Sequence, residues 1–151
     1  MTDTQINRIA HRTNYSFWGI WILAISIVFS FEFELLPSGV LVGEDRLLYI
    51  LQSFGVLLAI VAIPGALKLF HIKLQELLKL PKEEALRPYL HWAVARDWAL
   101  GFVIQFNLIF YFLSFNKAFA FIVLITLLAT LFCLPGKERV CSDLQIEITN
   151  P

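Results

Sequence analysis

Four residues with acid–base or anion-binding side chains lie close together in the sequence: Arg87, His91, Arg96 and Asp97. Arg87 and His91 are four residues apart, so on a helix they share one face and can contact the same ligand. Arginine binds phosphate groups through paired N–H donors, and an aspartate near a histidine can transfer protons. The group has three interpretations: charges that orient a membrane helix, a contact for anionic lipid headgroups, or a catalytic site acting on those headgroups. We prefer the first, because it requires the least additional chemistry.

Two carboxylates and two amides fall inside apolar stretches, where polar groups are costly and often functional. Glu32 and Glu34 lie near the end of the first stretch. Either one of them binds a cation or proton at an outer vestibule, or both lie among lipid headgroups with Arg46 as a partner. We prefer the headgroup position, since ion relays usually place a carboxylate nearer the membrane midplane. Gln105 and Asn107 occupy the middle of the third stretch, where amides commonly hydrogen-bond to neighbouring helices, and substrate binding is the alternative.

The cysteines and histidines are too scattered to indicate a metal or redox site. Cys133 and Cys141 are eight residues apart on the side predicted to face a reducing cytoplasm, so no disulfide is expected. The three histidines have no i,i+3 or i,i+4 spacing; they are His11, His71 and His91. Phosphate-binding-loop, zinc-protease and serine-hydrolase signatures are also missing from the sequence. We therefore predict no catalytic residue, no metal site and no cofactor, and we favour a role that is not enzymatic.

The composition indicates a membrane protein. Of the 151 residues, 58% are hydrophobic and only 16% are charged, whereas about 25% of residues in soluble domains are charged. The 12 Lys and Arg residues equal the 12 Asp and Glu residues, so the formal net charge is zero. This balance excludes a basic nucleic-acid-binding domain, and two cysteines exclude a disulfide scaffold.

Four apolar stretches are long enough, or nearly so, to cross a membrane as helices. A span needs about 20 mostly apolar residues, and the stretches cover residues 17–36, 47–67, 98–115 and 118–134. Backbone groups in lipid must be satisfied within each segment, and the period-2 alternation of barrel strands is missing. The sequence therefore predicts an all-α fold: a single membrane domain over residues 1–151, with four antiparallel transmembrane helices in a bundle.

The segment between the second and third stretches, residues 68–97, is predicted to form an amphipathic helical hairpin. Its apolar residues recur at helical spacing on one face, as do Phe70, Leu74, Leu77 and Leu78. The Pro64–Gly65 pair can kink a helix that continues from the second stretch, or the amphipathic part lies flat on the membrane. Pro81 suits the first turn of the next helix, and Pro88 marks a plausible bend.

The distribution of Lys and Arg predicts the orientation. Two lie before the first stretch, six between the second and third, and two after the fourth, whereas Arg46 and Lys117 alone lie on the other side. Positively charged residues remain on the cytoplasmic side, so both termini are expected there. The four Trp residues lie near the same ends of the first and third stretches, as interfacial aromatics do. We read the first stretch as a retained span and expect a multi-pass protein of a bacterial cytoplasmic membrane.

Three hypotheses for function follow. We prefer an accessory, structural or interaction subunit of a membrane assembly, because the span interiors are nearly uncharged and catalytic residue sets are missing. The first alternative is a small oligomeric transporter or channel that uses the outer-leaflet carboxylates. The second is a membrane enzyme acting on lipid headgroups at the cytoplasmic face. The expected partners are the bilayer, anionic lipids at the cytoplasmic face, and a membrane protein or further copies of the chain; nucleic acid is not expected.

Overall fold

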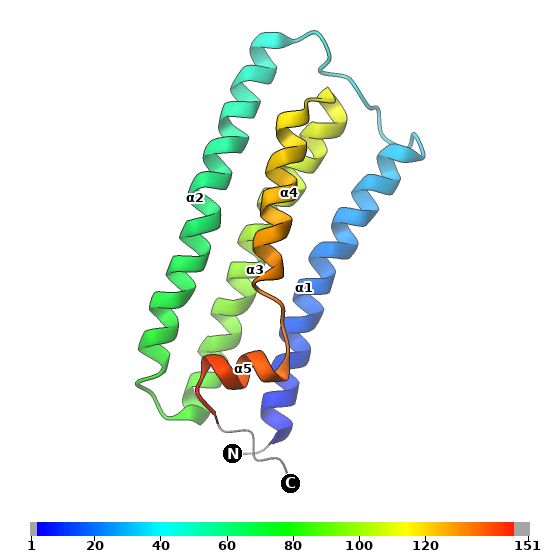
Figure 1. Ribbon diagram of the computed structural model, residues 1–151. Helices are drawn as coiled ribbons and strands as arrows, with labels where there is room; N and C mark the ends of the chain where they lie inside the picture. The colour runs from blue at the N-terminus through cyan, green and yellow to red at the C-terminus, as the bar shows by residue number, and fades with distance from the viewer. Residues whose placement is uncertain (1–2, 147–151) are drawn as a thin grey trace.

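The computed structural model describes residues 3–146, and every regular element in that part of the chain is an α-helix (Figure 1). In chain order the helices are α1 (Asp3–Glu32), α2 (Asp45–Leu77), α3 (Lys82–Ser114), α4 (Lys117–Leu131) and α5 (Lys137–Asp143). The predicted all-α fold is therefore confirmed. Helices α1, α2 and α3 are long and apolar enough to cross a membrane, whereas α4 is apolar but has only 15 residues.

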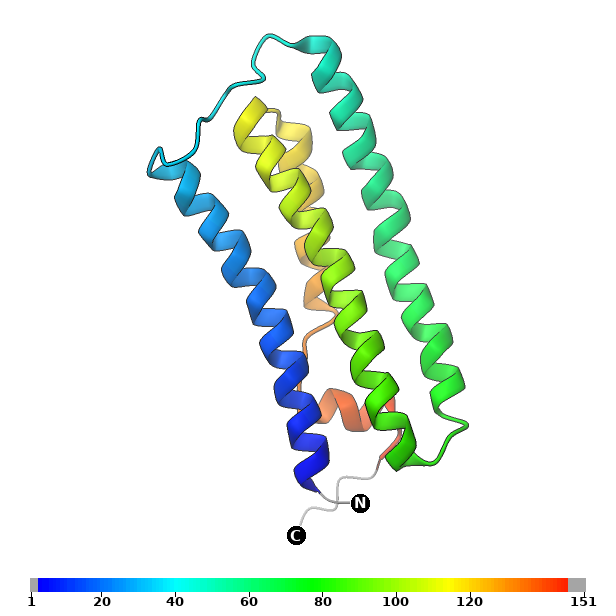
Figure 2. The ribbon, with the colours of Figure 1, turned by 180° about the vertical axis from the view of Figure 1, so that it is seen from behind.

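Helix α3 is the centre of the arrangement. It packs along α1, α2 and α4, and α2 also contacts α4 more lightly. The views from the two sides show α3 between α1 and α2, with α4 on one face (Figures 1 and 2). The short helix α5 lies across one end of the long helices and packs on α1. We call this the α5 end, and we call the opposite end, where residues 33–44 join α1 to α2, the loop end.

Both long central helices continue through an internal proline. Helix α2 extends past Pro64 and α3 past Pro88, so neither residue ends its helix. Segment 68–97 thus consists of the last turns of α2 and the first turns of α3, joined by a turn at residues 78–81. Pro81 directly precedes α3, where its missing N–H costs no helical hydrogen bond, and Glu83 and Glu84 follow in the first turn.

Helix α4 is shorter than the apolar stretch 118–134 because the chain turns after Leu131. At about 1.5 Å per residue, 15 residues span about 22 Å, less than the roughly 30 Å of hydrocarbon in a bilayer. Phe115 ends α3 in the left-handed conformation. The side chain of Asn116 then caps α4 by accepting a hydrogen bond from the Ala118 N–H at 3.0 Å.

The loop end is held to the end of α3 by backbone hydrogen bonds and by one pair of stacked rings. The N–H groups of Gly39 and Leu41 donate to the carbonyls of Phe112 and Leu113, both at 2.9 Å, and so pair groups that a helix end leaves unsatisfied. The Phe31 and Phe112 rings stack with centroids 4.9 Å apart. These contacts fix loop 33–44 on α3.

Two glycines allow α3 to approach its neighbours closely, Gly55 of α2 and Gly101 of α3 itself. A Cβ on Gly55 of α2 would lie 2.5 Å from Oδ1 of Asn107, and a Cβ on Gly101 of α3 would lie 2.9 Å from Ile20 of α1. Neither contact leaves room for a methyl group. Small residues of this kind let membrane helices pack backbone to backbone.

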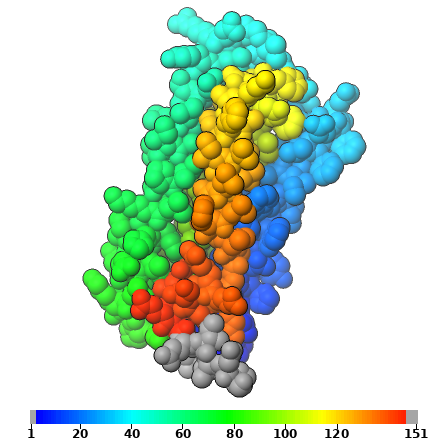
Figure 3. All heavy atoms as spheres, in the orientation of Figure 1, coloured from blue at the N-terminus to red at the C-terminus, as the bar shows by residue number. Residues whose placement is uncertain are grey.

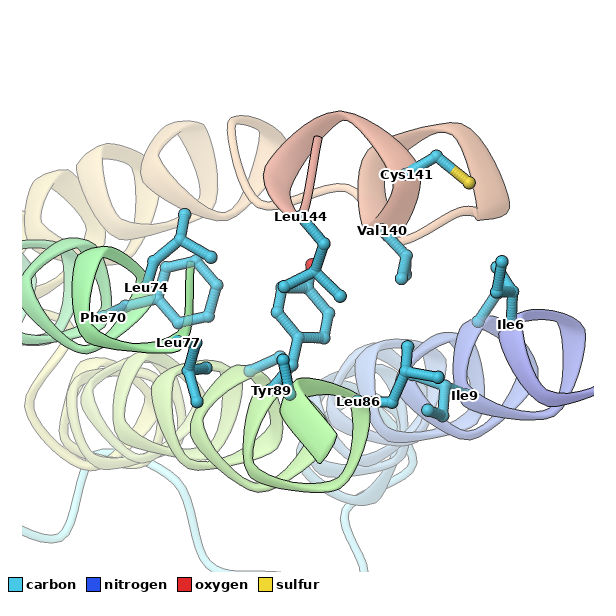
Figure 4. Packing of buried hydrophobic residues seen from close by; sticks show 13 residues of the cluster. Ile6, Ile9, Phe70, Leu74, Leu77, Leu86, Tyr89, Val140, Cys141 and Leu144 are labelled. Atoms are coloured by element: carbon cyan, nitrogen blue, oxygen red, sulfur yellow. The ribbon is translucent and has the colours of Figure 1, made fainter. Parts of the chain in front are cut away.

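An apolar core lies at the α5 end. It draws apolar side chains from α1, α2, α3 and the α5 region into one cluster (Figure 4). The members, which we call the α5-end core, are Ile6, Ile9, Ala10, Phe70, Leu74, Leu77, Ala85, Leu86, Tyr89, Ala93, Val140, Cys141 and Leu144. Phe70, Leu74 and Leu77 belong to the predicted apolar face of segment 68–97, and all three are buried.

Replacing Gly55 with alanine is expected to lower the free energy of unfolding by about 1–3 kcal/mol, the usual cost of overpacking a filled core. The matched control is Gly65→Ala on the same helix, where a Cβ meets nothing within 4 Å. Alanine is the better helix former, so this control should be neutral or stabilising by up to about 1 kcal/mol. Unfolding in mild detergent, followed by circular dichroism, measures both; equal effects would contradict the close approach at Gly55.

Candidate functional site

A buried ion pair lies in the middle of α3. Nη2 and Nε of Arg96 donate to Oδ1 of Asp97 at 3.0 and 3.1 Å. The two residues are only 6% and 3% exposed. Consecutive helical residues point about 100° apart, and both are covered here because α3 has neighbours on several sides.

Helix α2 completes one side of this pair. The Arg96 guanidinium lies over the Phe70 ring, 4.3 Å from its centroid, a favourable arrangement for a desolvated cation. The second carboxylate oxygen of Asp97, Oδ2, is buried and has no hydrogen-bond partner among residues 3–146. A buried carboxylate with one satisfied oxygen depends strongly on its cation, because Arg96 provides its only close countercharge within the described part of the chain.

A second polar contact joins α3 to α5. The hydroxyl of Tyr89 donates to Oδ2 of Asp143 at 2.8 Å, and Arg139 lies 3.3 Å from the other oxygen of that carboxylate. Burial, and secondarily the Asp143 charge, raise the pKa of the Tyr89 phenol above its usual range. The protonated phenol serves as the hydrogen-bond donor that joins α3 to α5.

A groove with a basic rim runs between the first turns of α1 and the first turns of α3. Its volume is about 480 Å³, and three arginines line it: Arg8, Arg12 and Arg87. All three are exposed. Arg8 and Arg12 are one helical turn apart on α1, and Arg87 comes from α3. The arrangement can bind an anion, because guanidinium groups from two helices flank one hollow.

The structure divides the group of residues that the sequence placed together. Arg87 lies in the basic groove, while Arg96 and Asp97 are buried among the helices. His91 is exposed on α3, where its ring meets the Trp92 ring edge-on at 6.0 Å. The four residues therefore do not form one site.

Glu32 and Glu34 lie at the loop end. Helix α1 ends at Glu32, and Glu34 follows in a left-handed conformation with φ of 56°. Both are exposed, so neither lies in the packed interior. Within residues 3–146, neither forms an ion pair with Arg46.

The two amides in the last third of α3, Gln105 and Asn107, contact neighbouring helices in different ways. Nε2 of Gln105 donates to the carbonyl of Ile20 on α1 at 3.1 Å. Nδ2 of Asn107 donates to Val103 of its own helix at 2.9 Å, while its Oδ1 faces Gly55 on α2. Both side chains thus lie at helix–helix contacts.

Sequence reasoning did not find the contribution of Arg8 to the groove, nor that of Asn116 to the loop end. The signal for Arg8 is its spacing of four residues from Arg12 in a helical segment. Asn116 Nδ2 donates to Oε1 of Gln52 on α2 at 2.9 Å, besides capping α4. That contact has no sequence signal, because it joins residues 64 positions apart.

Within the described part of the chain, no group of three His, Cys, Asp or Glu residues could hold a metal ion. Cys133 and Cys141 are both free and buried.

Replacing Arg96 with methionine is expected to lower the free energy of unfolding by about 3–5 kcal/mol, because Asp97 is left buried without a countercharge. The control is Arg139→Gln, which removes a partly exposed ion pair and should cost less than about 1 kcal/mol. Adding Asp97→Asn to Arg96→Met should recover part of the loss. Denaturant titration in detergent measures these three variants and Asp97→Asn alone. A double variant as unstable as the sum of Arg96→Met and Asp97→Asn would contradict the role of charge.

Known proteins give no indication of the function of this chain, so its own geometry is the basis for a proposal. No family model, no curated protein and no solved structure matches this chain. The features that bear on function are therefore the packed centre of the bundle, the buried pair on α3, and the basic groove at the α5 end.

Proposed function

We propose that the chain crosses the membrane four times, with α1 to α4 as the crossings and the α5 end in the cytoplasm. Large apolar side chains project outward from the middle of all four helices, as lipid-facing residues do; examples more than half exposed are Ile22, Leu57, Phe102 and Ile125. After α4, exposed Phe132 and Leu134 extend its apolar surface toward the α5 end. Ten of the twelve Lys and Arg residues belong to this end, which supports a cytoplasmic α5 end in a bacterial membrane.

Labelling of single introduced cysteines tests this orientation. Ser38→Cys lies in the loop end and Ser142→Cys on α5, and both positions are exposed. A membrane-impermeant maleimide should label Ser38→Cys in intact cells and Ser142→Cys only after lysis. Buried Cys133 and Cys141 give the background in the unmodified chain. Equal labelling of both variants in intact cells would contradict four crossings.

We further propose that the protein is an accessory or structural subunit of a membrane assembly. The observation that carries this proposal is the packed centre of the bundle: Leu100, Val103, Asn107, Phe119 and Thr126 are at most 1% exposed. Transport requires a wettable path with polar groups along it. The membrane-depth amides instead contact adjacent helices, as Gln105 does with Ile20.

An apolar groove between α2 and α4 is the best surface for a partner's transmembrane helix. Its volume is about 400 Å³, and its lining residues are all apolar: Val56, Ala59, Ile60, Ile63, Pro64, Ile122 and Ile125. Ala59 at its base and the nearby Gly65 are small residues. They allow the backbone of another helix to approach closely in lipid.

Isolation from native membranes in mild detergent, followed by native mass spectrometry, tests the accessory role. We expect a stoichiometric complex with another membrane protein, and a photo-crosslinker in place of Ile60 should react with that same partner. The control position is Ile22, exposed on α1 away from the groove. A free monomer would contradict the proposal, and an assembly of this chain alone would favour the transport alternative.

A further inference from the structure

The basic groove has an apolar floor and a cationic rim. Ile9 from α1 and Leu86 from α3 form part of the floor, and both also belong to the α5-end core. The floor is therefore held in place by the packing beneath it. The rim carries the guanidinium groups of Arg8, Arg12 and Arg87, so the hollow suits a ligand with both an apolar part and an anionic group.

The three rim arginines carry more positive charge than the other described residues of the groove balance. Glu83 also lines the groove and contributes one negative charge against three positive ones. Like charges brought together around one hollow repel each other, and an anion bound among them relieves that repulsion.

The groove opens at the level of the lipid headgroups, given the membrane crossing proposed above. Arg12 precedes Tyr15 by one helical turn and Trp18 by less than two, and both aromatic side chains are exposed. These distances are about 4.5 and 9 Å along the helix. Exposed Tyr and Trp mark the membrane interface, and the headgroup layer adds roughly 5–7 Å on each side of the hydrocarbon. Arg12 thus reaches that layer, and Arg8 and Arg87 continue the rim away from the membrane.

We propose that this groove binds the phosphate group of an anionic phospholipid. Arg12 and Arg87 reach the phosphate from two different helices, and Arg8 extends the positive rim. The inference rests on the proposed membrane insertion but not on the proposed accessory role. A soluble phosphate ester shares the phosphate chemistry, and the position beside the aromatic belt favours the lipid.

Lipid retention by the purified full chain in neutral detergent tests the proposal. Native mass spectrometry during titration with phosphatidylglycerol or phosphatidylcholine reports how much of each lipid is bound. Phosphatidylglycerol should bind at least tenfold more tightly. Each of Arg8→Gln, Arg12→Gln and Arg87→Gln should weaken its binding about 5-fold, and the triple variant roughly 100-fold, as expected for about 1 kcal/mol per basic residue at a lipid surface.

Two matched controls separate a defined site from general basicity. Lys68→Gln removes an exposed charge from α2 at the same end but outside the groove, and should change binding less than twofold. Arg87→Lys keeps the charge but loses paired N–H donation, and should weaken binding several-fold. Circular dichroism verifies folding, and the single variants remain informative if the triple variant fails to fold.

Three results would overturn the proposal. The first is equal binding of the two lipids. The second is a loss in Lys68→Gln as large as that in Arg87→Gln, which would indicate diffuse electrostatic attraction. The third is displacement of the lipid by millimolar inorganic phosphate, which would identify a soluble phosphate as the ligand. A protein that fails to co-fractionate with membranes would refute the membrane insertion instead.

Discussion

The enclosure of α3 by three other helices is the constraint on which the rest of the structure depends. Because α1, α2 and α4 all pack on it, side chains on several of its faces are covered at once. This is why adjacent Arg96 and Asp97 are both buried, and why the amides of Gln105 and Asn107 lie at helix contacts. A charge or polar group on one of these covered faces of α3 depends on partners within the bundle, because the neighbouring helices keep water away from it.

Two different packing regimes follow along the length of the bundle. Within the membrane crossings proposed above, lipid is as apolar as the side chains, so close approach and hydrogen bonding hold helices together. The pairs Gly55–Asn107 and Gly101–Ile20 fit that regime. At the α5 end, apolar burial from water is available as a driving force, and the largest apolar cluster lies there. Figure 3 shows α5 and the segment that joins α4 to α5 covering the front of the bundle near this end.

The position of each charge in these two regimes decides its chemistry. Arg96 lies against Phe70 and Asp97 inside the bundle, where its contribution is to compensate a buried carboxylate. Arg87 lies only nine residues earlier on the same helix, yet it is exposed beside two arginines of α1. Arg96 is therefore suited to stabilising the fold, and Arg87 is suited to binding an anion.

The sequence by itself determined the helical class and the three long apolar helices, because both depend on composition and on period along one segment. It also determined the apolar face of residues 70–77, which is a local helical pattern. Only the tertiary structure decided that α2 and α3 continue through Pro64 and Pro88, since the local sequence is equally compatible with a kink or a helix end at a proline. Likewise, helical spacing predicts that Arg87 and His91 share one face of a helix. The packing of α1 on α3 additionally brings Arg87 close to Arg8 and Arg12. Such groupings depend on which helix faces meet, and a single segment carries no information about that.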